Sequence, residues 1–121
     1  MSRLTTSEWW NRTIQIVAND ADFIQLSKHL QPIEVRFEVD AFQINLLFHQ
    51  GTLHRADHNN HHLTVTGRHE VWEDLVAGKT VWGQATNVHL GKLAVQGDAL
   101  AGVWLTRPIW QFWRVTRAHQ L

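Results

Sequence analysis

Four histidines, His54, His58, His61 and His62, fall within nine positions of this chain. With Asp57 they offer imidazole and carboxylate groups, and the spacing His58-x-x-His61 suits a divalent metal held on a turn. A zinc site, however, needs three or four converging ligands with supporting hydrogen bonds. The loop is rich in asparagine and little preorganised, and strand alternation sends His61 and His62 to opposite faces. We therefore favour solvent-exposed histidines over a metal site, and we expect no cofactor.

Nucleophilic and phosphate chemistry have little basis in the sequence. There is no cysteine, and the serines lack the Gly-x-Ser-x-Gly pattern of a nucleophile elbow. The seven glycines are scattered singly, so the sequence contains no glycine-rich phosphate-binding loop. We therefore predict no catalytic residues and a protein that is not an enzyme.

Acidic side chains offer the remaining route to acid–base chemistry. Glu34, Glu38 and Asp40 alternate with Arg36, which is typical of a solvated strand face with cross-strand charge pairs. Asp98 stands just before a predicted helix, where a carboxylate accepts hydrogen bonds from the first backbone N–H groups. We interpret Asp98 as a helix cap rather than a general base.

The aromatic side chains are the strongest candidates for a function. The chain has seven tryptophans and no tyrosine, and Trp104, Trp110, Phe112 and Trp113 fall within ten residues. Each buried aromatic ring removes about 150–250 Å² from water. The set therefore suits a hydrophobic cavity, a packed core or a dimer interface, and the residues alone leave these three open.

Periodicity places the elements that must position these side chains. A capping-box pattern at Thr5-x-x-Glu8 and helical spacing predict one bent or two short helices over residues 7–30. Residues 33–39 and 42–48 alternate with period two and predict an antiparallel hairpin. Further strands are predicted over 52–56, 62–66 and 92–96, with a helix over 69–77 and a last helix after Asp98 that Pro108 should break or kink. This order predicts an α+β domain of two layers, with an antiparallel or mixed sheet of about five strands.

The stretch from Val65 to Asp98 combines several of these parts in a characteristic order. A short strand ends at Gly67, a helix with one apolar face ends at Gly78, and glycines frame a second short strand. The matching positions are Trp72, Leu75, Gly78, Gly91, Lys92, Leu93, Val95, Gly97 and Asp98. This order resembles the SCP2-like (sterol carrier protein 2) lipid-binding family.

The resemblance implies a single SCP2-like domain over residues 1–121, with helices packed on one face of a curved sheet. It implies non-catalytic binding of a fatty acyl chain or another lipid between sheet and helices, with the last helix at the entrance. Arg107 and Arg114 are weaker candidates for a ligand head group. The predicted ligand contacts are Trp72, Trp82, Leu100, Trp104, Ile109, Trp110, Phe112 and Trp113. The alternative is an interaction or dimerisation module whose cavity is filled by its own Trp side chains.

Charge and hydropathy narrow the partners. The formal net charge is +0 and the pI is about 7.1, which argues against a sequence-independent nucleic-acid binder. No apolar run approaches the roughly 20 residues that span a bilayer. The first residues lack the apolar stretch of a signal peptide, and Ala-His-Gln-Leu is not a peroxisomal signal. We expect a cytoplasmic protein that binds a small hydrophobic molecule, and a homodimer if an aromatic patch is exposed.

Overall fold

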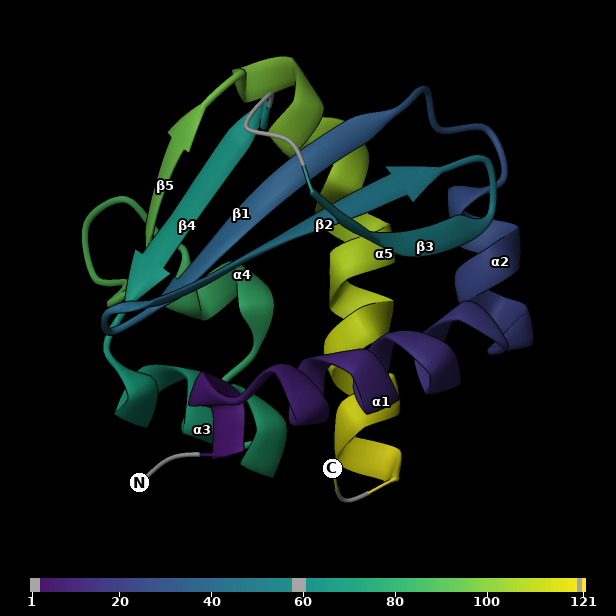
Figure 1. Ribbon diagram of the computed structural model, residues 1–121. Helices are drawn as coiled ribbons and strands as arrows, with labels where there is room; N and C mark the ends of the chain where they lie inside the picture. Colours follow the sequence, from purple (N-terminus) through teal and green to yellow (C-terminus); the bar gives the residue numbers. More distant parts are fainter. Residues whose placement is uncertain (1–2, 58–60, 120) are drawn as a thin grey trace.

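The computed structural model describes residues 3–57, 61–119 and 121. Figure 1 shows a sheet with the helices gathered on one side of it. The strands are β1 (Ile33–Val39), β2 (Phe42–His49), β3 (Thr52–Ala56), β4 (Leu63–Gly67) and β5 (Ala94–Gly97). The helices are the 3-10 turn η1 (Arg3–Thr5), α1 (Ser7–Ala18), α2 (Ala21–Ser27), α3 (His69–Ala77), α4 (Trp82–Ala85) and α5 (Ala99–Ala118).

The sheet is mixed and open, with the strand order β3-β2-β1-β4-β5. Neighbouring strands are antiparallel except β1 and β4, which are parallel. Strand β5 is therefore an edge strand that pairs with β4, and Val65 lies opposite Val95 in their register. The predicted α+β class and the five-stranded mixed sheet are confirmed.

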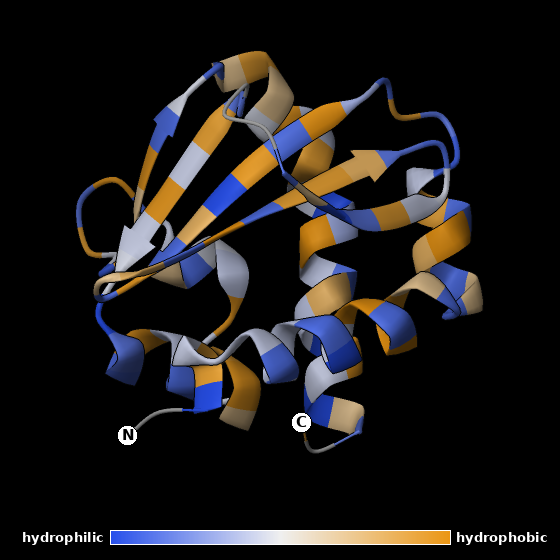
Figure 2. Ribbon diagram, in the orientation of Figure 1, coloured by the Kyte–Doolittle hydropathy of each residue, from blue (hydrophilic) through white to orange (hydrophobic). Residues whose placement is uncertain are grey.

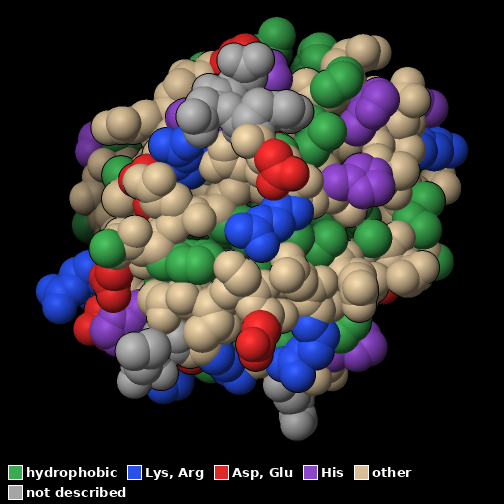
Figure 3. Space-filling view, in the orientation of Figure 1, with side chains coloured by type: hydrophobic (Ala, Val, Ile, Leu, Met, Phe, Trp, Pro, Cys, Tyr) green, Lys and Arg blue, Asp and Glu red, His purple; other side chains and the backbone are tan. Residues whose placement is uncertain are grey.

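Alternation along the central strands explains why helices cover one face. On β1, Val35 and Phe37 are fully buried, and Figure 2 shows hydrophobic and hydrophilic residues alternating along this strand. On the other face Arg36 donates from Nε to the Asn45 Oδ1 atom at 3.1 Å, and Thr66 donates to Glu38 at 2.8 Å. Figure 3 shows acidic, basic and histidine side chains interspersed in this view. Arg36 and Glu38 on this face are thus bonded to polar side chains of the neighbouring strands.

The N-terminal region forms two short helices, one of the two arrangements predicted. Asp20 interrupts it by capping α2: its Oδ2 accepts a hydrogen bond from the Phe23 N–H at 2.9 Å. Helix α1 begins at Ser7, where the residues predicted the start of a helix, and its cap is Thr6, whose hydroxyl oxygen accepts from the Trp9 N–H, rather than Thr5 of the capping-box pattern. Strand β5 begins two residues later than predicted, because the Leu93 N–H is bonded to the Ala85 carbonyl instead of the β4 ladder.

Helix α5 runs without interruption for 20 residues, with Pro108 inside it. Of the predicted break or kink at Pro108, the break is therefore wrong. Proline removes one backbone hydrogen bond, but Leu105, Pro108, Ile109 and Phe112 are all buried, so packing on both sides of the proline holds the helix. Among the described residues, no helix is both long and apolar enough to cross a bilayer.

The centre of the molecule is an aromatic core that consists of Trp10, Phe37, Trp72, Phe112 and Trp113. Trp10 stacks on Phe37 with ring centroids 5.4 Å apart, and Phe112 meets Trp113 edge-on at 4.8 Å. Each ring is at most 2% exposed. These rings come from α1, β1, α3 and α5, so the aromatic core joins the sheet to three of the helices over it.

Candidate functional site

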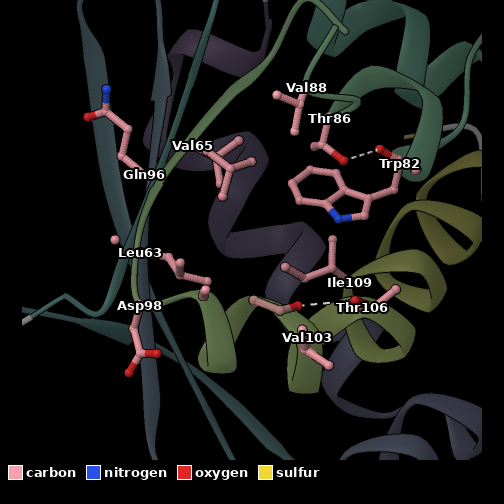
Figure 4. A pocket seen from close by; sticks show the side chains of 15 residues that line it. Leu63, Val65, Trp82, Thr86, Val88, Gln96, Asp98, Val103, Thr106 and Ile109 are labelled. Carbon is pink, nitrogen blue, oxygen red and sulfur yellow. Dashed lines mark hydrogen bonds between the residues drawn. The ribbon is translucent and has the colours of Figure 1, made fainter.

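A groove of about 480 Å³ lies beside the aromatic core, between the β4–β5 edge of the sheet and helices α4 and α5. Its volume falls in the range of small-molecule sites, about 300–1,000 Å³. Figure 4 shows apolar side chains from these elements turned toward a common space. The apolar side chains that line it most directly are Leu63, Val65, Trp82, Val88, Val95, Val103 and Ile109.

The groove exists because the helices pack against β4 but leave the neighbouring edge strand β5 uncovered. Val65 and Val95 are register partners on neighbouring strands, yet Val65 is fully buried and Val95 is 42% exposed. Two helix positions that line the groove are glycines: Gly83 on α4 has no atom within 4 Å of an added Cβ, and the nearest atom to one at Gly102 on α5 is a Leu63 methyl carbon 4.0 Å away. The β5 side of the sheet therefore faces a void where larger side chains would have packed.

Trp82 forms the boundary between the groove and the aromatic core. It lines the groove, and its ring also stacks on Trp113 with centroids 6.5 Å apart and planes 17° apart. The Thr86 hydroxyl donates to the Trp82 carbonyl at 2.8 Å and fixes the end of α4. A molecule in the groove would therefore contact a ring whose other neighbour is the core.

Three polar side chains of the groove lining already make hydrogen bonds within the protein. Thr106 donates from its hydroxyl to the Gly102 carbonyl at 3.1 Å, and Thr86 is bonded as described. Asp98 caps α5, since its Oδ1 accepts from the backbone N–H groups of Leu100 and Ala101 at 3.0 and 3.3 Å. This confirms Asp98 as a helix cap. In Figure 4 the side chains of Gln96 and Asp98 point away from the common space, so the arrangement suits burial of an apolar group rather than acid–base chemistry.

The structure divides the predicted ligand contacts into three groups. Trp82 and Ile109 line the groove. Trp72, Phe112 and Trp113 lie in the aromatic core and are at most 2% exposed. Leu100, Trp104 and Trp110 are exposed on α5, as are Arg107 and Arg114.

Sequence reasoning missed the strand side chains Leu63, Val65 and Val95 and the glycines at 83 and 102. Two signals pointed to some of them: the alternation that turns Leu63 and Val65 inward, and the small residues near the start of the last helix, which include Gly102. Neither signal reveals that β5 extends past the cover of the helices.

The histidine-rich loop provides no described metal centre. His62 sits beside β1, where its Nδ1 accepts a hydrogen bond from the Glu34 N–H at 3.1 Å. His54 lies on β3 opposite Leu47, and His58 falls outside the described residues. Within residues 3–57, 61–119 and 121, no three histidine, aspartate or glutamate side chains form a group that could hold a metal ion.

One carboxylate is electrostatically distinct. Asp40, in the β1–β2 turn, lies 2.7 Å from His69 Nδ1 at the start of α3 and also accepts from the His69 N–H. The hydrogen bond from the His69 side chain is the main reason that the pKa of Asp40 is lowered from its ordinary 3.8. Both side chains are more than 40% exposed, so this pair joins the turn to α3 rather than forming a reactive centre.

The mixed five-stranded sheet with helices on one face is an SCP2-like fold, because solved structures of that fold match it over most of the chain. The crystal structure of a sterol carrier protein 2 matches with a TM-score of 0.74 and 10% identity over 95% of this chain and 98% of that one. A UbiJ-SCP2 ubiquinone synthesis protein matches with a TM-score of 0.63 and 16% identity over 93% and 96% of the chains. The solution structure of palmitated SCP2L2 from Aedes aegypti matches with a TM-score of 0.51 and 21% identity over 86% and 95%. No family model and no curated protein matches the sequence itself.

Proposed function

We propose that this protein binds a hydrophobic ligand, such as a fatty acyl chain, in the groove between β4, β5, α4 and α5, without chemistry. The observation that carries the proposal is the largely apolar groove of about 480 Å³ beside a buried core. Val95 exposes apolar surface on the inner side of the sheet, and contact of apolar surface with water is unfavourable. An acyl chain in the groove would bury this surface. We take residues 1–121 as a single cytoplasmic domain.

The likeness to solved structures supports the choice of ligand. One neighbour is named a sterol carrier protein and another was solved as a palmitated protein. The groove lacks the cationic side chains that would bind an anionic head group: its lining includes Asp98 but no arginine, lysine or histidine. We therefore propose that affinity comes from the acyl chain, at about 25 cal/mol per Å² of apolar area less the cost of ordering it.

The predicted alternative, an interaction module whose cavity is filled by tryptophan, has one observation in its favour. Trp72 and Trp113 occupy the centre of the space between sheet and helices. They leave the β5 side open, however, and this is why we favour a ligand-binding groove.

A pair of substitutions at Gly102 tests the proposal. In Gly102→Leu the new side chain would enter the groove and take the place of about three methylene groups of a ligand, each worth about 0.8 kcal/mol. We expect palmitic acid to bind at least about tenfold more weakly, measured by isothermal titration calorimetry.

Gly102→Ala is the matched control. It makes the same change from glycine in the helix, but its Cβ would sit 4.0 Å from Leu63 and leave the groove open. We expect this variant to bind palmitic acid as the parent does and to be more stable by about 0.5–1 kcal/mol, because alanine favours a helix interior. Equal palmitate affinity in the Leu and Ala variants, or no palmitate binding by the parent chain, would refute the groove as the site.

A further inference from the structure

Six side chains share the solvent-facing side of α5, and the groove accounts for only one of them. They follow helical spacing along the helix, so they form one continuous row. We call this row the outer face of α5: Leu100, Val103, Trp104, Arg107, Trp110 and Arg114. Val103 is 67% exposed, Leu100 57% and Trp104 49%. A helix face that only meets water is normally polar, so these large apolar side chains require a partner.

The charged residues of this helix indicate an anionic partner. From Ala99 to Ala118 it carries arginines and no aspartate or glutamate. The Arg114 guanidinium lies 4.5 Å from the centre of the Trp110 ring, so its stem follows the ring while its charge stays accessible. Two carboxylates of the described residues contact the helix, and both already accept hydrogen bonds. Asp20 accepts from the Phe23 N–H and the Gln111 side chain, and Asp98 accepts from the first backbone N–H groups of the helix. The outer face therefore combines apolar, tryptophan and cationic groups.

We propose that the outer face of α5 docks on the surface of an anionic phospholipid bilayer, with the helix lying along the membrane plane. Tryptophan rings are favoured at the boundary between head groups and acyl chains, and arginines pair there with phosphates. The row from Leu100 to Arg114 is about 21 Å long at about 1.5 Å per residue, so it presents a straight, shallow contact that suits a plane.

The position of the groove distinguishes a bilayer from a protein partner. Val103 belongs both to the outer face and to the groove lining, and Val88, which is 93% exposed, lies across the same opening. A membrane on the outer face would meet the mouth of the groove, so an acyl chain could pass between them without crossing water. This link rests on the proposed function, whereas docking itself depends only on the outer face.

Vesicle sedimentation with the full chain tests the docking. The probes are phosphatidylcholine vesicles with and without about 30 mol % phosphatidylserine. We expect binding to the mixed vesicles that weakens with added salt, and little binding to phosphatidylcholine alone. In Arg107→Gln/Arg114→Gln, binding should fall about fivefold for each arginine and about 25-fold for the pair. Leu100→Gln/Trp104→Gln should also weaken it, because the apolar anchor is lost.

Two matched variants control for charge and position. Arg107→Lys/Arg114→Lys keeps both charges and should retain most of the binding, while Arg12→Gln/Arg68→Gln removes two exposed arginines elsewhere and should bind within about twofold of the parent. Palmitate titration without vesicles reports separately on the groove.

Three results would overturn docking on a bilayer. The first is that the parent chain binds neither kind of vesicle. The second is that the two Arg→Gln pairs lose binding equally. The third is that the parent chain binds no vesicles but forms a concentration-dependent dimer in sedimentation velocity, and that Leu100→Gln/Trp104→Gln abolishes this dimer. The last would assign the outer face to a second copy of the chain.

Discussion

The aromatic core and the groove lie side by side over the same sheet, and they share helix α5. In the core, Phe112 and Trp113 of α5 meet rings from α1, β1 and α3, and the space is full. In the groove, α5 offers Gly102, Val103 and Thr106 to the β4–β5 edge, and the space stays open. The sheet and the helices thus enclose one filled region, the aromatic core, and one open region, the groove. Large side chains of α5 fill the first, and small side chains of the same helix leave the second open.

This difference assigns separate roles to the tryptophans. The tryptophans of the aromatic core, Trp10, Trp72 and Trp113, hold the sheet and the helices together. Trp82 contacts both the core and the groove. Trp104 and Trp110, on the outer face of α5, do neither. Substitutions in the two regions should therefore separate stability from ligand binding, and the following changes run from the largest expected effect to the smallest.

Trp113→Ala should cause the largest loss of stability. The Trp113 ring contacts Trp72, Phe112 and Trp82 and is 2% exposed. Its removal should lower the free energy of unfolding by about 3–5 kcal/mol, because a large cavity forms in a packed core. Urea unfolding followed by circular dichroism measures this. Trp104→Ala on the outer face should stay within about 1 kcal/mol of the parent. Similar losses in both variants would contradict the distinction between a buried core tryptophan and an exposed one.

Gly97→Ala should destabilise the groove side by about 1–3 kcal/mol. Gly97 ends β5 with φ of 121°, and an added Cβ would collide with the carbonyl oxygen of His62. Hydrogen exchange should accelerate at β5 and the start of α5 before it does so in β1. Gly83→Ala, which meets nothing within 4 Å, provides the control. Unchanged exchange at β5 in Gly97→Ala would show that this edge tolerates the collision.

Asp40→Asn should have the smallest effect, at a contact outside both regions. Folding lowers the pKa of Asp40 below its ordinary 3.8, chiefly through the hydrogen bond from His69. The pair therefore stabilises the fold above that pH, and its contribution is lost as pH falls through the lower folded-state pKa. Urea midpoints from about pH 6 to about pH 2 should converge for parent and variant at the acid end. A constant difference at all pH values would contradict ionisation of Asp40 as the cause.

The fold was predictable because its local signals agree. The alternation over residues 33–48 specified the hairpin, Gly78 specified the end of α3 with its φ of 79°, and Asp98 specified the start of α5. Pro108 misled the prediction because its local cost is outweighed by burial of its neighbours, which the sequence does not display. The β1–β4 parallel pairing is equally hidden, since it joins segments about 28 residues apart.

The site was predictable only in part. Trp82 and Ile109 line the groove, but the aromatic residues predicted as ligand contacts also include residues of the core and of the outer face of α5. The sequence does not distinguish a tryptophan in a groove from one in a core or on an exposed helix face. A void depends on what is missing between elements, here large side chains at 83 and 102, and on how far β5 extends past its cover. Both properties arise from packing rather than from local pattern.

Native mass spectrometry tests the central claim most directly. The purified chain, before and after incubation with palmitic acid, would be compared with its denatured mass, together with an organic extract of the sample. The groove predicts one ligand per chain, either carried through purification or acquired from palmitic acid, and its loss in Gly102→Leu but not in Gly102→Ala. A bare chain in every sample, or the same occupancy in both Gly102 variants, would contradict a ligand-binding groove.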